Sequence, residues 1–196
     1  MSQQVETNYA VQLDNRDRST VIWRAILVAP VAVFASSFAV NTWDNSGYSS
    51  GLLVLPVILA VLFRGVYPSY VLTFNKALFS LTNRIWAYFA LLSDQYPSIE
   101  ESEVVTISYP EIEGGKTLSR GLPLIKWAMA IPLYIVGIAY ALYAFMLIVL
   151  GWFSIVLNGS LPPYCADGIV RTGQFWNRVY GYAILLVTDE YPTFTL

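Results

Sequence analysis

The chain has 196 residues, of which 56% are hydrophobic and only 12% are charged, and its formal net charge is −2. Soluble domains carry about 25% charged residues, so this composition is typical of a membrane protein. The small negative charge argues against a protein that binds nucleic acid by neutralising phosphates.

The residue counts also limit the chemistry. Histidine is absent, which removes the commonest general base and the commonest metal ligand. Cys165 is the single cysteine, which excludes an intrachain disulfide and a thiol cage for a metal. We interpret Cys165 as a small packing residue rather than as a reactive or acylated thiol. No phosphate-binding glycine loop is present either, so we expect no enzyme, no cofactor and no metal site.

Segments 1–20 and 21–64 predict a cytoplasmic tail with a short strand, followed by a transmembrane hairpin. The alternating stretch YAVQL (9–13) predicts the strand. Two apolar runs, 21–40 and 48–63, then flank the turn-forming sequence NTWDNSG. The first run would be about 30 Å long as a helix, which matches the bilayer core. It is too long for a cleaved signal, so we expect it to remain as an anchor.

Segment 65–97 predicts an amphipathic helix and a closing turn. Polar residues recur at three- and four-residue spacing from Thr73 to Arg84, opposite a broad apolar face. We expect this helix to lie along the cytoplasmic membrane interface; a helix packed on the hairpin with a few solvated residues is the compatible alternative. Pro97 cannot continue a helix and is predicted to stop it.

Segment 98–122 predicts a cytoplasmic linker with a second short strand, VVTISY (104–109), which could pair with the first. Segment 123–158 contains an apolar run at 124–157 in which Lys126 is the only charged residue. One helix over this run would measure roughly 51 Å, well beyond a bilayer core. We therefore predict two arms, which form a second transmembrane hairpin.

The basic residues support the same topology. All 11 lysines and arginines lie outside the predicted hairpin tips. The positive-inside rule then places both termini and the central segment in the cytoplasm, as in a multi-pass protein of the bacterial inner membrane. A single third span would instead send Arg171 and Arg178 to the outside.

A repeated phrase divides the chain into two copies. NRIWAYFALLSDQYP (83–97) returns as NRVYGYAILLVTDEYP (177–192), which indicates an internal repeat. Segment 159–196 is therefore expected to repeat the amphipathic helix and the closing turn. The repeated motif contains Arg84, Tyr88, Asp94, Tyr96 and Pro97 in the first copy and Arg178, Tyr182, Asp189, Tyr191 and Pro192 in the second.

These segments together predict an all-α integral membrane protein. It has two tandem repeats, each with a short strand, a transmembrane helical hairpin and an interfacial amphipathic helix. Asp94 and Asp189 are expected to fix the structure by pairing with a basic residue, for example Arg84 and Arg178, rather than to act in catalysis.

The repeat unit resembles a bacterial membrane family catalogued as domain of unknown function 4389. The likeness rests on SRGLPLIKWAMAIP, an apolar run ending in Gly-x-x-Pro, R-x-x-x-Y and the closing TDEYPTF. It covers essentially the whole chain and fits the second copy better. The first copy departs at Ser93, where the pattern favours threonine, and at 98–99, where it favours an aromatic residue. The resemblance implies the fold and the membrane placement and no chemistry.

The function predicted from the sequence is a non-enzymatic membrane scaffold or accessory subunit, with a protein partner or a homo-oligomer in the membrane and no nucleic acid. The alternative is binding or movement of lipids or other amphiphiles at the cytoplasmic leaflet, where basic residues would hold anionic head groups. A channel or transporter is disfavoured because no acidic residue lies in mid-span. The candidate head-group contacts are Arg64, Lys76, Arg84, Arg171 and Arg178.

Overall fold

A computed structural model of the chain describes residues 4–38 and 53–196, and most of these residues are helical. The two strands form one antiparallel pair. Short 3₁₀ turns at Glu113–Gly115 and Leu122–Leu124 lie between the second strand and the helix that begins at Lys126. The elements in chain order are β1 (Glu6–Tyr9), α1 (Arg18–Leu27), α2 (Ala29–Ser36), α3 (Val54–Arg64), α4 (Ser69–Phe89), β2 (Val105–Ser108), α5 (Lys126–Met129), α6 (Ile131–Asn158) and α7 (Pro163–Ala183).

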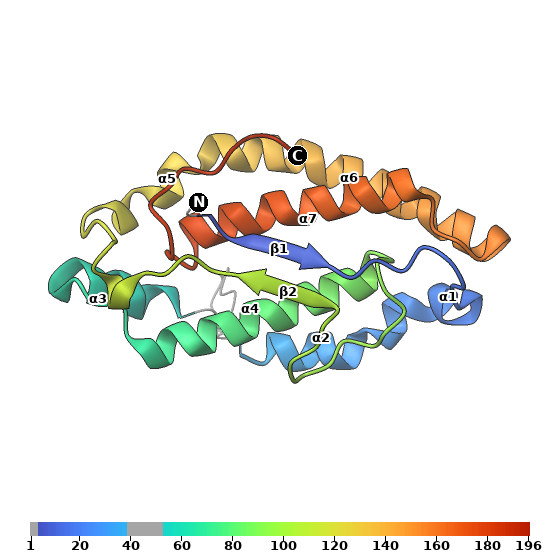
Figure 1. Cartoon of the computed structure of the whole chain (residues 1–196), viewed down its shortest axis with the longest axis horizontal. Coiled ribbons are helices and arrows are strands. Elements are labelled where there is room, and N and C mark those ends of the chain that lie inside the picture. Colours follow the sequence, from blue (N-terminus) through green and yellow to red (C-terminus); the bar gives the residue numbers. More distant parts are fainter. Residues whose placement is uncertain (1–3, 39–52) are drawn as a thin grey trace, which may run out of the picture.

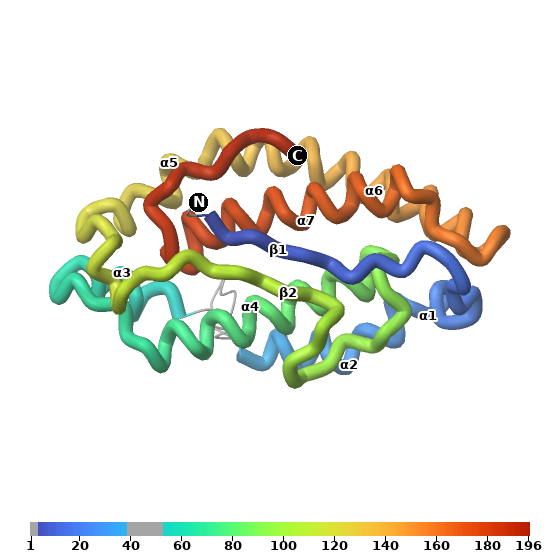
Figure 2. Tube along the Cα trace, in the orientation of Figure 1, coloured from blue at the N-terminus to red at the C-terminus, as the bar shows by residue number. Residues whose placement is uncertain are grey.

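The elements form three layers that all run along the long axis of the molecule (Figure 1). The strands β1 and β2 form the first layer and lie against α7 and α4. The helices α4 and α7 are the middle layer. The outer layer contains α6, which packs along α7, and α2, which packs on α4. The trace in Figure 2 shows the central ribbon of β1 and β2 between the two helical halves.

The prediction that the two short strands pair with each other is confirmed. Thr7 lies opposite Ile107, and Tyr9 lies opposite Val105. The first strand is Glu6–Tyr9, which shares only Tyr9 with the predicted stretch 9–13. Alternate side chains of β1 are buried, since Thr7 and Tyr9 point to the helices and Glu6 and Asn8 are exposed.

Local sequence signals explain where the helices begin and end. The Asp17 carboxylate accepts hydrogen bonds from the amides of Ser19 and Thr20 and caps α1. Gly65 and Gly159 end α3 and α6 with φ angles of 63° and 76°, a left-handed conformation that favours glycine. Pro68 and Pro162 then start α4 and α7 from the extended conformation.

The predicted second hairpin at 123–158 is wrong. The structure has one continuous helix of 28 residues, α6, and the chain bends before it, at Ala130, instead of in its middle. Gly137 and Gly151 lie inside α6 without breaking it. A Cβ at these positions would lie within 3 Å of Trp176 and Leu161, respectively, so the glycines let these large side chains approach the helix closely. A helix packed lengthwise on α7 does not need a turn.

The predicted first hairpin is described only in part, since its turn lies outside the described residues. Of its two arms, α1 and α2 extend from Arg18 to Ser36, and α3 covers Val54–Arg64; the predicted start of the second arm, at position 48, lies outside the described residues. Two helical segments, Arg18–Ser36 and Ile131–Asn158, are long and apolar enough to cross a membrane.

The two halves of the chain make matching contacts with each other. The amide of Leu161 donates to the carbonyl of Leu13, and the amide of Tyr67 donates to the carbonyl of Gly114. Leu161 and Tyr67 occupy the same place in the two predicted copies, two residues after the glycine that ends the preceding helix. Each half therefore holds the turn of the other half by the same backbone hydrogen bond.

The polar stripe predicted for the amphipathic helices is buried only in part. Thr73 and Arg171 are exposed. Asn83, Arg84 and Asn177 are each 6% exposed or less. Asn83 is covered because it hydrogen-bonds with Tyr9 of β1 and Asn177 of α7. The expectation of a solvated or head-group-facing polar stripe is therefore wrong for Asn83, Arg84 and Asn177.

Candidate functional site

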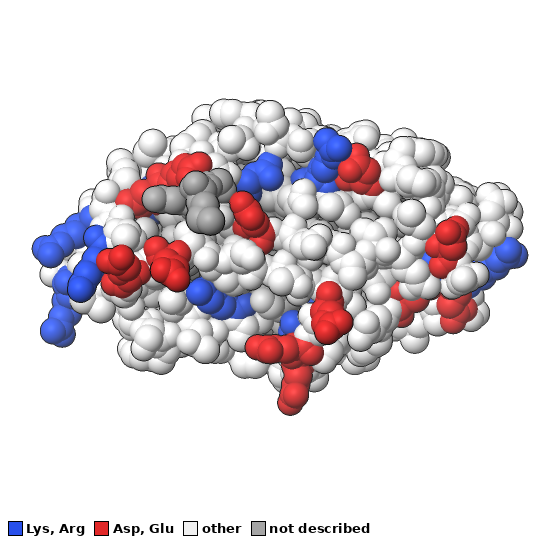
Figure 3. Space-filling model, viewed as in Figure 1, with Lys and Arg blue, Asp and Glu red and all other residues white. Residues whose placement is uncertain are grey.

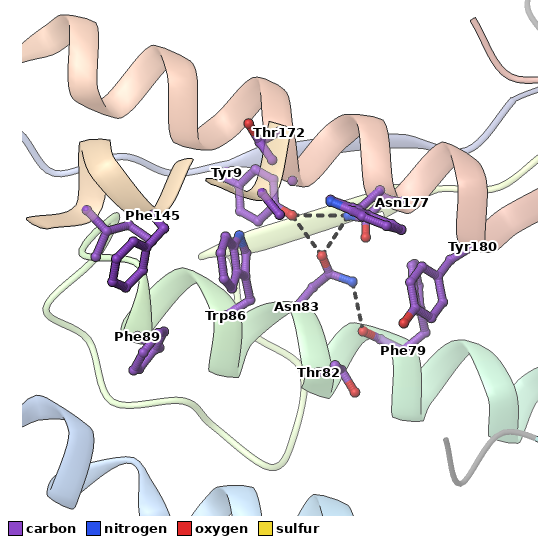
Figure 4. A pocket seen from close by; sticks show the side chains of 14 residues that line it. Tyr9, Phe79, Thr82, Asn83, Trp86, Phe89, Phe145, Thr172, Asn177 and Tyr180 are labelled. Carbon is purple, nitrogen blue, oxygen red and sulfur yellow. Dashed lines mark hydrogen bonds between the residues drawn. The ribbon is translucent and has the colours of Figure 1, made fainter. Parts of the chain in front are cut away.

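A cavity of about 640 Å³ lies between the two middle-layer helices. Helices α4 and α7 form its sides, Tyr9 of β1 reaches it from the strand layer, and α6 supplies a further apolar wall. Figure 4 looks into it with the strands behind the labelled side chains. The lining residues are Tyr9, Phe79, Thr82, Asn83, Trp86, Phe89, Ala141, Phe145, Ile148, Thr172, Gly173, Trp176, Asn177 and Tyr180.

An uncharged hydrogen-bonded cluster occupies the end of the cavity nearest the strands (Figure 4). The Tyr9 hydroxyl donates to Asn83 Oδ1 at 2.7 Å. Asn177 Nδ2 lies 2.6 Å from Asn83 Oδ1, 3.0 Å from the Tyr9 oxygen and 2.9 Å from Thr7 Oγ1. Asn83 and Asn177 are the first residues of the two repeated phrases, so corresponding residues of the two copies meet here.

The cavity holds no ionic chemistry of its own. No charged side chain among the described residues lines it. Burial raises the pKa of Tyr9 well above its usual range, and the hydrogen bond with Asn177 opposes this rise only in part, so the phenol stays protonated. Trp86 Nε1 is buried and makes no hydrogen bond within the described part of the chain. The walls are otherwise aromatic or aliphatic.

The five basic residues predicted to hold anionic head groups do not gather in one place. Arg84 donates to the carbonyls of Ser98 and Ile99, and Arg178 donates to the carbonyl of Thr195. These two arginines hold the segment that follows their own helix. Arg171 forms an exposed ion pair with Asp167, Lys76 lies over the ring of Tyr109, and Arg64 is the last residue of α3.

Asp94, in the first copy of the repeated motif, binds two buried arginines. Its carboxylate lies 2.7 Å from the Arg16 guanidinium and 2.5 Å from that of Arg24, and it accepts the amide of Asp17. Arg24 also donates to the carbonyls of Tyr88 and Ser93, and its guanidinium lies 4.4 Å from the centre of the Tyr88 ring. Burial favours the neutral acid, but the hydrogen bonds outweigh it and lower the pKa of Asp94.

Asp189, in the second copy, makes the equivalent contacts with a single cation. Lys126 Nζ lies 2.6 Å from its carboxylate and donates to the carbonyl of Thr188. The amide of Ser119 donates to Asp189, and Lys126 lies over the Tyr182 ring. Burial again opposes the net lowering of the pKa of Asp189. The suggested pairing of Asp94 and Asp189 with Arg84 and Arg178 is therefore wrong, since Arg16, Arg24 and Lys126 take that role.

The remaining motif residues pack around these ion pairs. Tyr88 contacts Tyr96, and Tyr182 contacts Tyr191, each pair edge to face. Pro97 and Pro192 are buried but do not stop the helices, which end at Phe89 and Ala183. Shortly after these ends the backbone takes a positive φ, at Leu91 and Leu186. The sequence gives no glycine signal for these two turns.

Among residues 4–38 and 53–196, no group of three or more acidic or cysteine side chains could hold a metal ion. Cys165 is a buried free thiol that packs beside Gly151 in the core, as a small packing residue would. The sequence did not identify Tyr9, Trp86 or Thr172 as site residues. The asparagines at the start of both repeated phrases were the available signal.

Comparison of the chain with protein-family models, with curated proteins and with solved structures finds no match.

Proposed function

We propose that this is a membrane protein that binds one uncharged amphiphile in the cavity between α4 and α7. The observation that carries the proposal is an apolar cavity of about 640 Å³ that ends in a neutral cluster of Asn83, Asn177 and Tyr9. Ligand sites typically have volumes of this order, largely apolar walls and a few convergent polar groups.

The chemistry of the cluster defines the head group of the ligand. Amide and phenol groups can donate and accept hydrogen bonds, so they suit an alcohol, an amide or an ester. A carboxylate or phosphate would bury its charge without a cation nearby, which is unfavourable. The proposal therefore takes up the amphiphile-binding alternative from the sequence, but with an uncharged head group and without the five basic residues.

The broader predictions accompany this proposal. The matched hydrogen bonds at Leu161 and Tyr67 support two tandem copies. The apolar length of Arg18–Ser36 and Ile131–Asn158 supports a membrane location. The bacterial inner membrane, the kinship with domain of unknown function 4389 and a role as an accessory subunit remain predictions. A protein that binds an amphiphile can also be a subunit of a larger complex, so these two functions do not exclude each other.

The test is a titration of the detergent-purified protein, followed by native mass spectrometry, with 1-hexadecanol as the uncharged probe and hexadecanoic acid as the charged one. The wild-type protein is expected to bind one hexadecanol and to bind hexadecanoate at least tenfold more weakly at pH 7. Ala141 is exposed on α6 and lines the cavity. The variant Ala141→Trp should fill the cavity and weaken hexadecanol binding by at least tenfold.

Leu142→Trp is the matched control, because Leu142 is the next residue of α6, is 64% exposed and does not line the cavity. It should bind hexadecanol as the wild type does. Equal binding by Ala141→Trp and the wild type would place the probe elsewhere and contradict the proposal. A preference for hexadecanoate would contradict the assignment of an uncharged head group.

A further inference from the structure

The helices α2 and α6 of the outer layer, together with α1, α3 and α5, carry almost no accessible charge. Helices α2 and α6 contain no charged residue. In α1, Arg24 is 2% exposed, and in α5, Lys126 is fully buried. The other basic residues of these helices, Arg18 and Arg64, are the first residue of α1 and the last residue of α3. The length of these helices is therefore apolar wherever it is accessible.

The accessible side chains of these helices are large and apolar. On α6, Ile135, Met146 and Leu157 are 66%, 59% and 69% exposed, and they are spread from one end of the helix to the other. On α1 and α3, Ile26 and Leu55 are 64% and 65% exposed. An apolar surface of this extent needs a partner, because monomeric soluble proteins rarely expose one.

The strand layer has the opposite character and lies against α7 and α4, near the middle of the long axis (Figure 1). Glu6 and Asn8 of β1 and Thr106 and Ser108 of β2 are exposed. The acidic loop 100–103 runs into β2 and is also exposed. Figure 3 shows acidic and basic side chains distributed over this face of the molecule, including its middle.

This arrangement conflicts with a span along the long axis. Because α7 packs along α6, and β1, β2 and α4 run along the same long axis (Figure 1), a vertical α6 would carry the strand pair into the hydrocarbon. Each strand of a two-stranded sheet has an unpaired edge, and lipid-exposed sheet edges do not occur within the hydrocarbon region. The charged loop beside the strands would enter the same region, at a further cost.

We infer that the protein lies flat in a single leaflet, with its long axis in the membrane plane. The hydrocarbon of that leaflet covers the accessible faces of α1, α2, α3 and α6, and the strand layer faces water. One layer of helices is about 10 Å thick, and one leaflet supplies about 15 Å of hydrocarbon. This placement differs from the multi-pass arrangement predicted from the sequence. It rests on the membrane location in the proposed function and not on ligand binding.

Depth measurements along α6 test the inference. Single-cysteine variants Ile135→Cys, Met146→Cys and Leu157→Cys, made in a Cys165→Ala background, place spin labels on one side of α6, because the sites are spaced by about three helical turns each. Asn8→Cys places a label on the strand layer. Each labelled protein is reconstituted into phosphatidylcholine vesicles, and label depth is measured from collision with oxygen and with a water-soluble nickel chelate.

The expected result is equal depth for the three α6 labels and access of water to the Asn8 label. A deep label at Met146 with shallow labels at Ile135 and Leu157 would show a span and overturn the inference. Free access of the nickel chelate to all three α6 labels would overturn it as well. Neither result depends on the hexadecanol titration, since a flat protein can have an empty cavity and a spanning protein can have a filled one.

Discussion

The two halves of the chain each contain an ion-pair site in which one aspartate binds buried cations, but the cations differ. In the first half, Asp94 binds Arg16 and Arg24, whose side chains are 0% and 3% exposed. In the second half, Asp189 binds Lys126 alone, whose side chain is 1% exposed. Both acids also accept one backbone amide, from Asp17 and from Ser119.

The difference matters because the two kinds of cation respond differently to losing their partner. A buried lysine can release its proton and become neutral, whereas an arginine cannot do so in a protein. The first half therefore depends on its carboxylate more strongly than the second half does. The Asp94 and Asp189 sites have similar geometry, but they are expected to contribute different amounts to the free energy of unfolding.

The largest expected effect comes from removing the two carboxylates in turn. Asp94→Ala leaves two buried guanidinium groups without their anion and should lower the free energy of unfolding by about 3–5 kcal/mol. Asp189→Ala should cost about 2 kcal/mol, because Lys126 can become neutral. Chemical denaturation in mild detergent measures both. An equal loss in the two variants would show that the choice of cation does not matter here.

Acid should weaken both sites, and the sign follows from the lowered pKa values of Asp94 and Asp189. A carboxylate whose pKa is lower in the folded state stabilises the protein above its unfolded pKa, about 3.9 for aspartate, and loses this effect as the pH falls through the folded value. The free energy of unfolding should therefore decrease as the pH drops below about 4.

Variants with asparagine identify the source of that pH dependence. Asp94→Asn should flatten the acid limb more than Asp189→Asn does, because three groups donate to Asp94. Asp17 also has a lowered pKa, mainly through its hydrogen bonds with Ser19, and it remains in both variants as a common background. An unchanged acid limb in the double variant would assign the dependence to other groups.

The comparison of the halves also shows what the sequence could predict. The repeated motif identified both acids as structural residues, and the alternating stretches predicted the paired strands. The helical periodicity of the sequence placed Asn83 and Asn177 on an outer polar stripe, whereas they are buried against each other. Helical periodicity shows that a helix has a polar side, but the partner of that side comes from a distant segment.

The prediction of a second hairpin was wrong for a related reason. Its length was judged against a bilayer crossed at right angles, whereas α6 packs lengthwise on α7 and ends where Gly159 permits a left-handed turn. Arg16 escaped notice because only the fold brings it to Asp94, 78 positions away along the chain. The cavity likewise requires α4, α6 and α7 together, and no single segment predicts its volume.

The smallest expected difference concerns the glycines that end α3 and α6. Both have positive φ, so alanine should cost about 1 kcal/mol at either position. A Cβ at Gly65 would lie 2.8 Å from Arg120 Nε, and one at Gly159 would lie 3.2 Å from Arg18 Nε. Both neighbours are flexible side chains, so the closer contact should add only a few tenths of a kcal/mol to the cost of Gly65→Ala. Denaturation of both variants side by side measures this difference. A larger loss of stability for Gly159→Ala would mean that the Arg18 side chain is held more firmly than that of Arg120. The contacts that each half makes with the glycine turn of the other half would then differ in rigidity, as the two ion-pair sites differ in their cations.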